Sequence, residues 1–204
     1  MAEHNPYAAP KAPVADESTP GNVFAQESEV EYGGFWRRVG AQILDALILA
    51  PLGLLAYFGM QFSPRFYAYY LIPGIVVGLF YSVYLVKRFG GTPGKRILDM
   101  RIVMLDGSPI TGSAAFWRYS VWLAVSTVSA AGAAIASLNI PLEGYESLGF
   151  LERVQMLDAN TPGWANIGTY AIWGWALVAA IVMLCNQQRR ATHDFIARTL
   201  VVRD

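Results

Sequence analysis

The sequence predicts an all-α membrane protein: a bundle of four transmembrane helices with both termini in the cytoplasm, a small cytoplasmic β pairing and a disordered N-terminal tail. Three observations predict this fold. The chain of 204 residues is 54% hydrophobic and 15% charged, with a mean hydropathy of +0.35, which is too apolar for an ordinary soluble domain. Four apolar stretches are long enough to cross a bilayer as helices. Basic residues gather on one side of those stretches.

The N-terminal tail is rich in proline, alanine and acidic residues and has few large apolar side chains. So little apolar surface does not offset the entropy that the chain loses on ordering. We therefore predict a disordered cytoplasmic tail over residues 1–31 and a transmembrane domain over residues 32–204. The stretch "NPYAAPKAP" within the tail is alternatively a docking peptide in the polyproline conformation.

Four stretches meet the length of about 20 apolar residues that a helix needs to cross a bilayer core of roughly 30 Å. They are residues 39–62, 66–86, 116–138 and 164–184. The third is the least hydrophobic and is rich in alanine, serine and glycine. The short stretches "FWRR" (35–38) and "FWRY" (116–119) are compatible with an old duplication of a two-helix hairpin.

The basic residues beyond the tail decide the orientation. If all four stretches cross the membrane, only Arg65 and Arg153 fall on one side, against twelve on the other. The twelve are Arg37, Arg38, Lys87, Arg88, Lys95, Arg96, Arg101, Arg118, Arg189, Arg190, Arg198 and Arg203. Cytoplasmic loops carry an excess of lysine and arginine, so the larger group is predicted to lie in the cytoplasm. Without the third span this asymmetry falls sharply, which favours four spans over three.

The two long loops have different characters. Residues 139–163, on the outer side, have a helical spacing of apolar residues, which predicts a short interfacial helix or else an irregular loop. These residues are Leu148, Leu151, Val154, Met156 and Leu157. The acidic residues of this loop also allow a vestibule that attracts cations. On the cytoplasmic side, residues 98–105 and 198–203 are rich in β-branched residues, and we predict that they pair as strands.

Asp45 is the polar residue that most needs an explanation. It lies about six residues inside the first span, which is roughly 10 Å below the interface. A charge at the centre of a membrane helix costs about 2.5–3.5 kcal/mol on insertion scales, so such residues serve ion paths, proton relays or buried pairs. Arg38 shares its helix face but points away from it. A water molecule or another segment is therefore predicted to close the gap between them. The candidate segments are Arg118, at the cytoplasmic end of the third span, and the cluster "RRATHDF" (189–195).

His193 and Asp194 follow the fourth span near the same interface. Asp194 is predicted to cap a short helical turn or to pair with Arg38, and His193 to titrate near neutral pH. Two interpretations remain open. In one, Arg38, Asp45, Arg118 and Asp194 form a structural network that pins the cytoplasmic ends of the helices. In the other, Asp45 is a site coupled to protons or cations.

Several classes of function lack a signal in the sequence. No histidine, cysteine or acidic cluster has the spacing of metal ligands, and no nucleophile and base are arranged for catalysis. We expect no enzyme, no cofactor and no nucleic-acid partner. The "GGTPGKR" element (90–96) is not a phosphate-binding loop, because that motif requires glycine at Phe89 and serine or threonine at Arg96.

Three motifs together carry a family resemblance: "GFWRRVGAQILDALIL", "GGTPGKRILDMRIVMLDG" and "RRATHDFIARTLVV". In this order, over about residues 32–203, they resemble the RDD family of bacterial integral membrane proteins. The arginine and two aspartates that name the family fall on Arg38, Asp45 and Asp194. The cytoplasmic loop motif of the family falls on Gly91, Thr92, Pro93, Gly94, Lys95 and Arg96. This sequence carries Arg198 where the family usually shows a small residue, often glycine.

The resemblance implies a multi-pass protein of the bacterial cytoplasmic (inner) membrane, in contact with the lipid bilayer. We expect an accessory or assembly protein whose partner is a second copy of itself or another membrane protein. Some members of the family are linked to sodium/proton antiport. The alternative is therefore a transporter that exchanges a monovalent cation for a proton, with Asp45 as the intramembrane acid.

Overall fold

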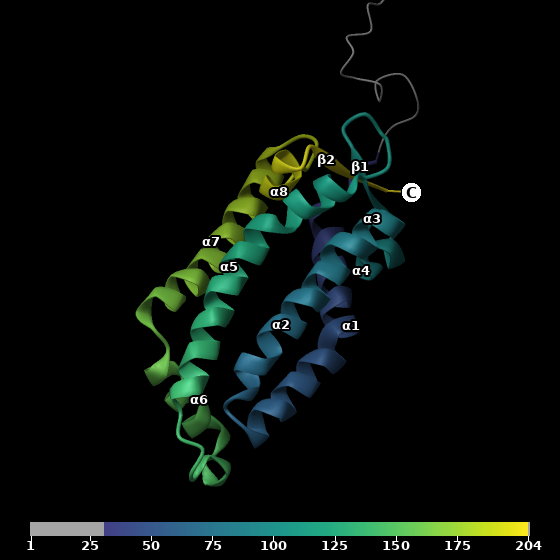
Figure 1. Cartoon of the computed structure of the whole chain (residues 1–204). Coiled ribbons are helices and arrows are strands. Elements are labelled where there is room, and N and C mark those ends of the chain that lie inside the picture. Colours follow the sequence, from purple (N-terminus) through teal and green to yellow (C-terminus); the bar gives the residue numbers. More distant parts are fainter. Residues whose placement is uncertain (1–30, 204) are drawn as a thin grey trace, which may run out of the picture.

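The computed structural model describes residues 31–203, in which long helices run side by side and a small sheet lies at one end (Figure 1). The predicted disordered tail lies outside the described residues, except for Glu31. The helices are α1 (Phe35–Phe62), α2 (Phe66–Leu79), α3 (Leu85–Phe89), α4 (Pro93–Ile97), α5 (Gly112–Asn139), α6 (Phe150–Asn160), α7 (Gly163–Cys185) and α8 (Thr192–Ile196). The strands are β1 (Met100–Met104) and β2 (Thr199–Arg203).

The predicted all-α fold with four helices of membrane-spanning length and a small β pairing is confirmed. Four helical segments are long and apolar enough to cross a membrane, and they contain the four predicted spans. The second segment is not a regular α-helix throughout, because a π-helical turn over Phe80–Tyr84 joins α2 to α3. The short helix predicted in the loop 139–163 is also present, as α6.

Small residues allow the long helices to pack closely, as is typical of helices in membranes. α5 lies between α2 and α7 and contacts both. A side chain at position 132 of α5 would overlap Ala165 of α7, so Gly132 is needed for this contact. Gly168 of α7 lies against the backbone of Ser129. The fourth long helix, α1, is much less covered, because Arg38, Ala41 and Ala56 are its only buried residues.

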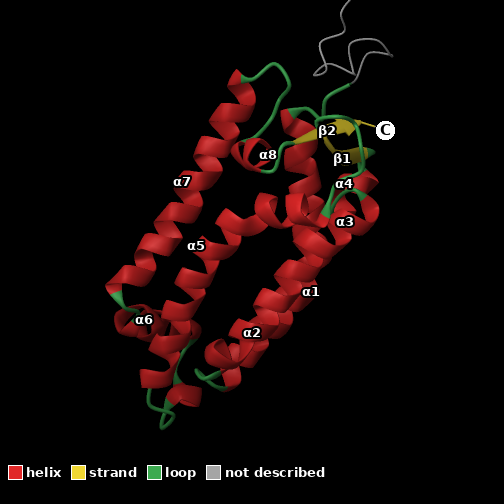
Figure 2. Ribbon diagram, turned by 45° about the horizontal axis from the view of Figure 1, so that its top comes forward, coloured by secondary structure: helices red, strands yellow, loops and turns green. Residues whose placement is uncertain are grey.

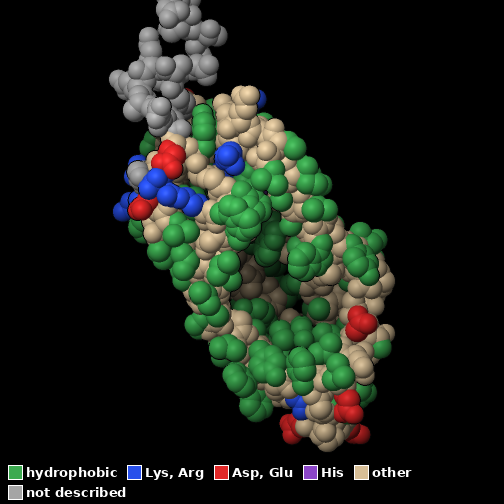
Figure 3. Space-filling view, turned by 180° about the vertical axis from the view of Figure 1, so that it is seen from behind, with side chains coloured by type: hydrophobic (Ala, Val, Ile, Leu, Met, Phe, Trp, Pro, Cys, Tyr) green, Lys and Arg blue, Asp and Glu red, His purple; other side chains and the backbone are tan. Residues whose placement is uncertain are grey.

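The exposed surface of the long helices is apolar, and the charged side chains lie at the two ends. Figure 3 shows hydrophobic side chains along the flank, around a hollow between the helices. Lysine and arginine gather at the end that carries the sheet, and acidic side chains at the opposite end. A surface of this kind is stable against lipid and would be costly in water. We call the end that carries β1, β2, α4 and α8 the sheet end (Figure 2).

The predicted strand pairing is confirmed. β1 and β2 are antiparallel, with Met100 opposite Arg203 and Met104 opposite Thr199. Both edges are covered, because Tyr32 bridges to Val202 and Pro109 bridges to Val103. Covered edges do not offer unpaired backbone groups to other chains.

The start of the folded part differs slightly from the prediction. Glu31, which the sequence places in the tail, accepts a hydrogen bond from the backbone N–H of Arg203 at 2.9 Å, and its carboxylate pairs with the Arg203 guanidinium at 2.6 Å. Gly33 also donates a backbone hydrogen bond to Val201 at 2.9 Å. The chain entering α1 is therefore attached to the C-terminal strand.

Apart from the 3-10 turn at Tyr145–Ser147 and α6, which lie between α5 and α7, one order of elements occurs twice: two long helical segments, a five-residue helix and a five-residue strand. In each half a residue with positive φ directly precedes the strand, Asp99 at 53° before β1 and Arg198 at 52° before β2. This order is compatible with the hairpin duplication considered from the sequence. The turn at Arg198 has a positive φ although the residue is not glycine, and the Arg198 side chain is exposed.

The opposite end is held by Arg153 of α6. Its guanidinium donates to the backbone oxygen of Gln61, at the end of α1, at 2.9 Å and to that of Tyr145 at 3.1 Å. The Tyr145 hydroxyl in turn donates to the backbone oxygen of Met60 at 3.0 Å. The two helical hairpins are thus joined at this end as well as at the sheet end.

Candidate functional site

Asp45 is surrounded by neutral donors. The Tyr81 hydroxyl donates to its Oδ1 atom at 2.6 Å, and the Gly94 backbone N–H donates to the same atom at 2.7 Å. The Thr92 hydroxyl donates to Oδ2 at 2.6 Å. Tyr81 comes from the π-helical turn, and Thr92 and Gly94 come from the start of α4. We call these four residues the Asp45 network, which joins three segments of the first half of the chain.

The sequence of the loop motif explains how α4 meets Asp45. The first N–H groups of a helix have no partner within the helix, and a carboxylate satisfies them well. Pro93 begins α4 without an N–H, so Gly94 is the first residue to offer one. A β-carbon at position 94 would overlap the backbone oxygen of Ala41 and lie 2.7 Å from Asp45 Oδ1. Only glycine therefore lets α4 approach α1 this closely.

Asp194 is the centre of a second network, at the start of α8. Its side chain is fully buried. The Oδ2 atom accepts from Arg38 Nη1 at 2.8 Å and from the Ala191 backbone N–H at 2.9 Å. The Oδ1 atom forms an ion pair with Arg118. Asp194 therefore both caps its own helix and pairs with Arg38, which are the two roles considered from the sequence.

The arginines of this network extend it to the strands. Arg118 Nη1 also donates to the Thr199 hydroxyl at 2.8 Å, at the start of β2. Arg38 Nε donates to the backbone oxygen of Gly33 at 3.0 Å. The guanidinium of Arg190 donates to the Asp194 backbone oxygen at 3.2 Å and stacks over the Phe195 ring. Asp194 thus links helices α1, α5 and α8 directly, and Arg118 extends the link to strand β2. We call Asp194 and these partners the Asp194 network.

Lys95 lies between the two networks. Its Nζ atom is 3.5 Å from the Thr92 hydroxyl, and its charge interacts with both Asp45 and Asp194. The nearby positive charges of Arg38 and Arg118 repel it. The sheet end thus buries more positive than negative charge, and Lys95 interacts electrostatically with the acids of both networks.

The charges around Asp194 set the protonation of its neighbour. Burial opposes ionisation of Asp194, but the positive charge of Arg118, above all, holds its pKa well below the usual value. Burial, reinforced by the charge of Arg118, lowers the pKa of His193 to about 3 although Nε2 lies 3.7 Å from Asp194 Oδ1. His193 is therefore neutral at physiological pH, and the prediction that it titrates near neutrality is wrong.

The structure divides the residues that the sequence grouped. Arg38, Arg118 and His193 surround Asp194, whereas Asp45 is separate. The predicted pairing of Asp45 with Arg118 or the 189–195 cluster is wrong, because the hydrogen bonds to Asp45 come from Tyr81, Thr92 and Gly94. The hydrogen bonds of the carboxylate therefore come from neutral donors in the π-helical turn and at the start of α4, which both lie beside it.

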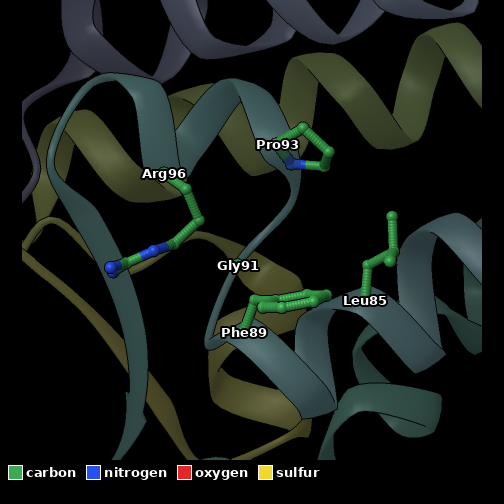
Figure 4. A pocket seen from close by; sticks show the side chains of 5 residues that line it. All are labelled: Leu85, Phe89, Gly91, Pro93 and Arg96. Carbon is green, nitrogen blue, oxygen red and sulfur yellow. The ribbon is translucent and has the colours of Figure 1, made fainter.

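Sequence reasoning missed Tyr81 and Thr199, and it placed Arg190 only within the 189–195 cluster. The sequence held a clue to Tyr81. A tyrosine within a span needs a hydrogen-bond partner for its hydroxyl, and an acid in the neighbouring span also needs one. Of the loop motif, Thr92, Gly94 and Lys95 reach the networks. Gly91, Pro93 and Arg96 instead line a separate hollow beside α3 (Figure 4).

The chain matches a known family model. The model of the RDD family matches residues 32–198. The match begins just before α1, ends directly before β2, and includes Arg38, Asp45 and Asp194. No curated protein and no solved structure matches the chain.

Proposed function

The chain belongs to the RDD family of multi-pass membrane proteins, and from this premise we propose that it is an accessory or assembly protein of the bacterial inner membrane. Both termini and the sheet end lie in the cytoplasm in this proposal. The sheet end serves as a rigid surface on which another membrane protein, or a second copy of the chain, docks.

The observation that carries the proposal is the state of the two family aspartates. Three donors hold Asp45, and two arginines with a backbone N–H hold Asp194. Each hydrogen bond to a charged group contributes roughly 1.5–3 kcal/mol, so these contacts fix α1, α4, α5 and α8 relative to one another. Such contacts support a structural role for both acids.

The alternative, a cation/proton antiporter, makes a different demand on Asp45. A sodium ion and a proton would have to compete for its carboxylate, which requires displacing Tyr81, Thr92 or Gly94 in each cycle. Antiport sites usually present several polar ligands near the middle of the membrane, often at broken helices. The accessory role needs no such displacement, and for that reason we favour it.

The turn after β1 is one part of the sheet end that suits contact with a partner. The backbone N–H and hydroxyl of Ser108 donate to Asp106 Oδ1 at 3.0 and 2.6 Å, and Met104 N–H donates to the Ser108 backbone oxygen at 2.9 Å. This ordered turn presents Leu105, which is 38% exposed. An apolar side chain on an ordered turn loses little entropy on binding.

The proposal predicts photo-crosslinking from the sheet end and not from the opposite end. A photoreactive amino acid is placed at Leu105, or as a control at Leu151 of α6, which is 65% exposed. In cells at native expression, Leu105 is expected to give one discrete membrane-protein adduct and Leu151 none. Mass spectrometry of the adduct separates a second copy from another protein. Equal adducts from both positions, or none from Leu105, would contradict the proposal.

A further inference from the structure

A hollow of about 290 Å³ lies between the end of α3 and the start of α4 (Figure 4). Leu85, Phe89 and Pro93 give it apolar walls, and Gly91 contributes backbone without a side chain. The stem of Arg96 completes the wall, and its guanidinium points away from Leu85. Ligand pockets start at roughly 300 Å³, so the hollow suits one part of a larger molecule.

The hollow lies where an apolar helical segment gives way to basic residues. It belongs to the apolar helical segment Phe66–Ile97, close to its end. Phe89 and Ile97 are 57% and 59% exposed, which places large apolar side chains on this surface. Lys87 and Arg88 lie in the last turn of α3, and the Arg88 guanidinium is 5.8 Å from the centre of the Phe89 ring. Aromatic and basic side chains gather in this way at the depth of lipid headgroups.

An apolar hollow with basic groups at its edge matches a ligand that is apolar at one end and anionic at the other. We propose that the hollow binds an anionic phospholipid from the leaflet at the sheet end. Part of an acyl chain packs against Leu85, Phe89 and Pro93, and the phosphate lies beside Arg96 and Arg88. A guanidinium donates paired hydrogen bonds to phosphate oxygens. Its positive charge is attracted more strongly to an anionic lipid than to a zwitterionic one.

This inference rests on the membrane location of the chain and not on its proposed accessory role. A soluble phosphate compound shares the anionic group but lacks the acyl chain that the apolar walls would contact. The two sources are therefore distinguished by whether binding needs the chain.

The test measures binding of phosphatidylglycerol and phosphatidylcholine to the purified full chain in mild detergent, by native mass spectrometry. Glycerol phosphate and inorganic phosphate are added as competitors. Each basic group near a membrane surface contributes a factor of about five, so we expect at least a severalfold preference for phosphatidylglycerol. Glycerol phosphate at equal concentration is expected to leave that preference unchanged.

Four variants locate the site. Arg96→Gln and Leu85→Trp are expected to abolish the preference, the first by removing the charge and the second by filling the hollow. Arg96→Lys is expected to keep most of it. Arg37→Gln, at the same end but outside the hollow, is expected to keep all of it. Circular dichroism and gel filtration confirm that each variant is folded.

Two results would overturn the proposal. One is equal retention of both lipids by the wild type, or a preference that survives in folded Leu85→Trp. The other is competition by inorganic phosphate or glycerol phosphate, which would assign the basic groups to a soluble anion.

Discussion

Replacing Asp194 with asparagine is expected to lower the free energy of unfolding by about 3–5 kcal/mol, the largest effect of any single polar change in this protein. The carboxylate is fully buried between Arg38 and Arg118. Asparagine keeps the volume but leaves two buried guanidinium groups without a counter-charge. Unfolding of the purified protein in a denaturing detergent measures this loss. Asp106→Asn is the matched control, because Asp106 is an exposed acid at the same end.

A small loss in Asp194→Asn, comparable with that in Asp106→Asn, would mean that the Asp194 network does not hold the helices together.

The dependence of stability on pH tests the same network independently. Unfolded His193 takes up a proton below about pH 6.5, whereas the folded residue does so only near pH 3. Stability should therefore fall as the pH drops through this window. His193→Gln should flatten that slope.

Gly94→Ala is expected to separate α4 from α1 and to destabilise the protein by about 1–3 kcal/mol or more. The added carbon would overlap the backbone oxygen of Ala41 and lie 2.7 Å from Asp45 Oδ1, so the hydrogen bond from Gly94 to Asp45 is lost as well. The same detergent unfolding measures the effect. Protease sensitivity of the 90–99 loop reports whether α4 has come away.

The loop motif supplies its own control for this change. At Gly91 the nearest atoms to an added carbon are 3.4 Å away, which is ordinary contact. Gly91→Ala should therefore be close to wild type in stability. If the two alanine variants behave alike, the close approach of α4 to Asp45 is not what fixes the loop.

The arrangement of helices and strands could largely be predicted from the sequence. The four spans follow from the length of the apolar stretches, and the β pairing follows from two β-branched runs on the same side of the membrane. The contact between Arg38 and Asp194 followed from their positions at one interface. These features depend on composition and on the side of the membrane, which a single sequence records directly.

The hydrogen-bond partners of Asp45 could not be predicted in the same way. An acid within a span calls for a partner, and charge pointed to Arg118, which in the structure pairs with Asp194 instead. The actual donors, Tyr81, Thr92 and Gly94, are neutral, and they meet Asp45 because the π-helical turn and the start of α4 lie beside α1. Neutral hydroxyl and backbone donors leave no charge pattern in a sequence.

The most direct test of a structural role for Asp45 is proton flux in everted vesicles from an antiporter-deficient host. Sodium, potassium or lithium is added to vesicles with wild type or Asp45→Asn at matched membrane levels. Our account predicts no cation-dependent flux from correctly inserted wild type, together with easier unfolding of Asp45→Asn. Cation-dependent flux in the wild type that disappears in folded Asp45→Asn would contradict the account and make Asp45 an exchange site.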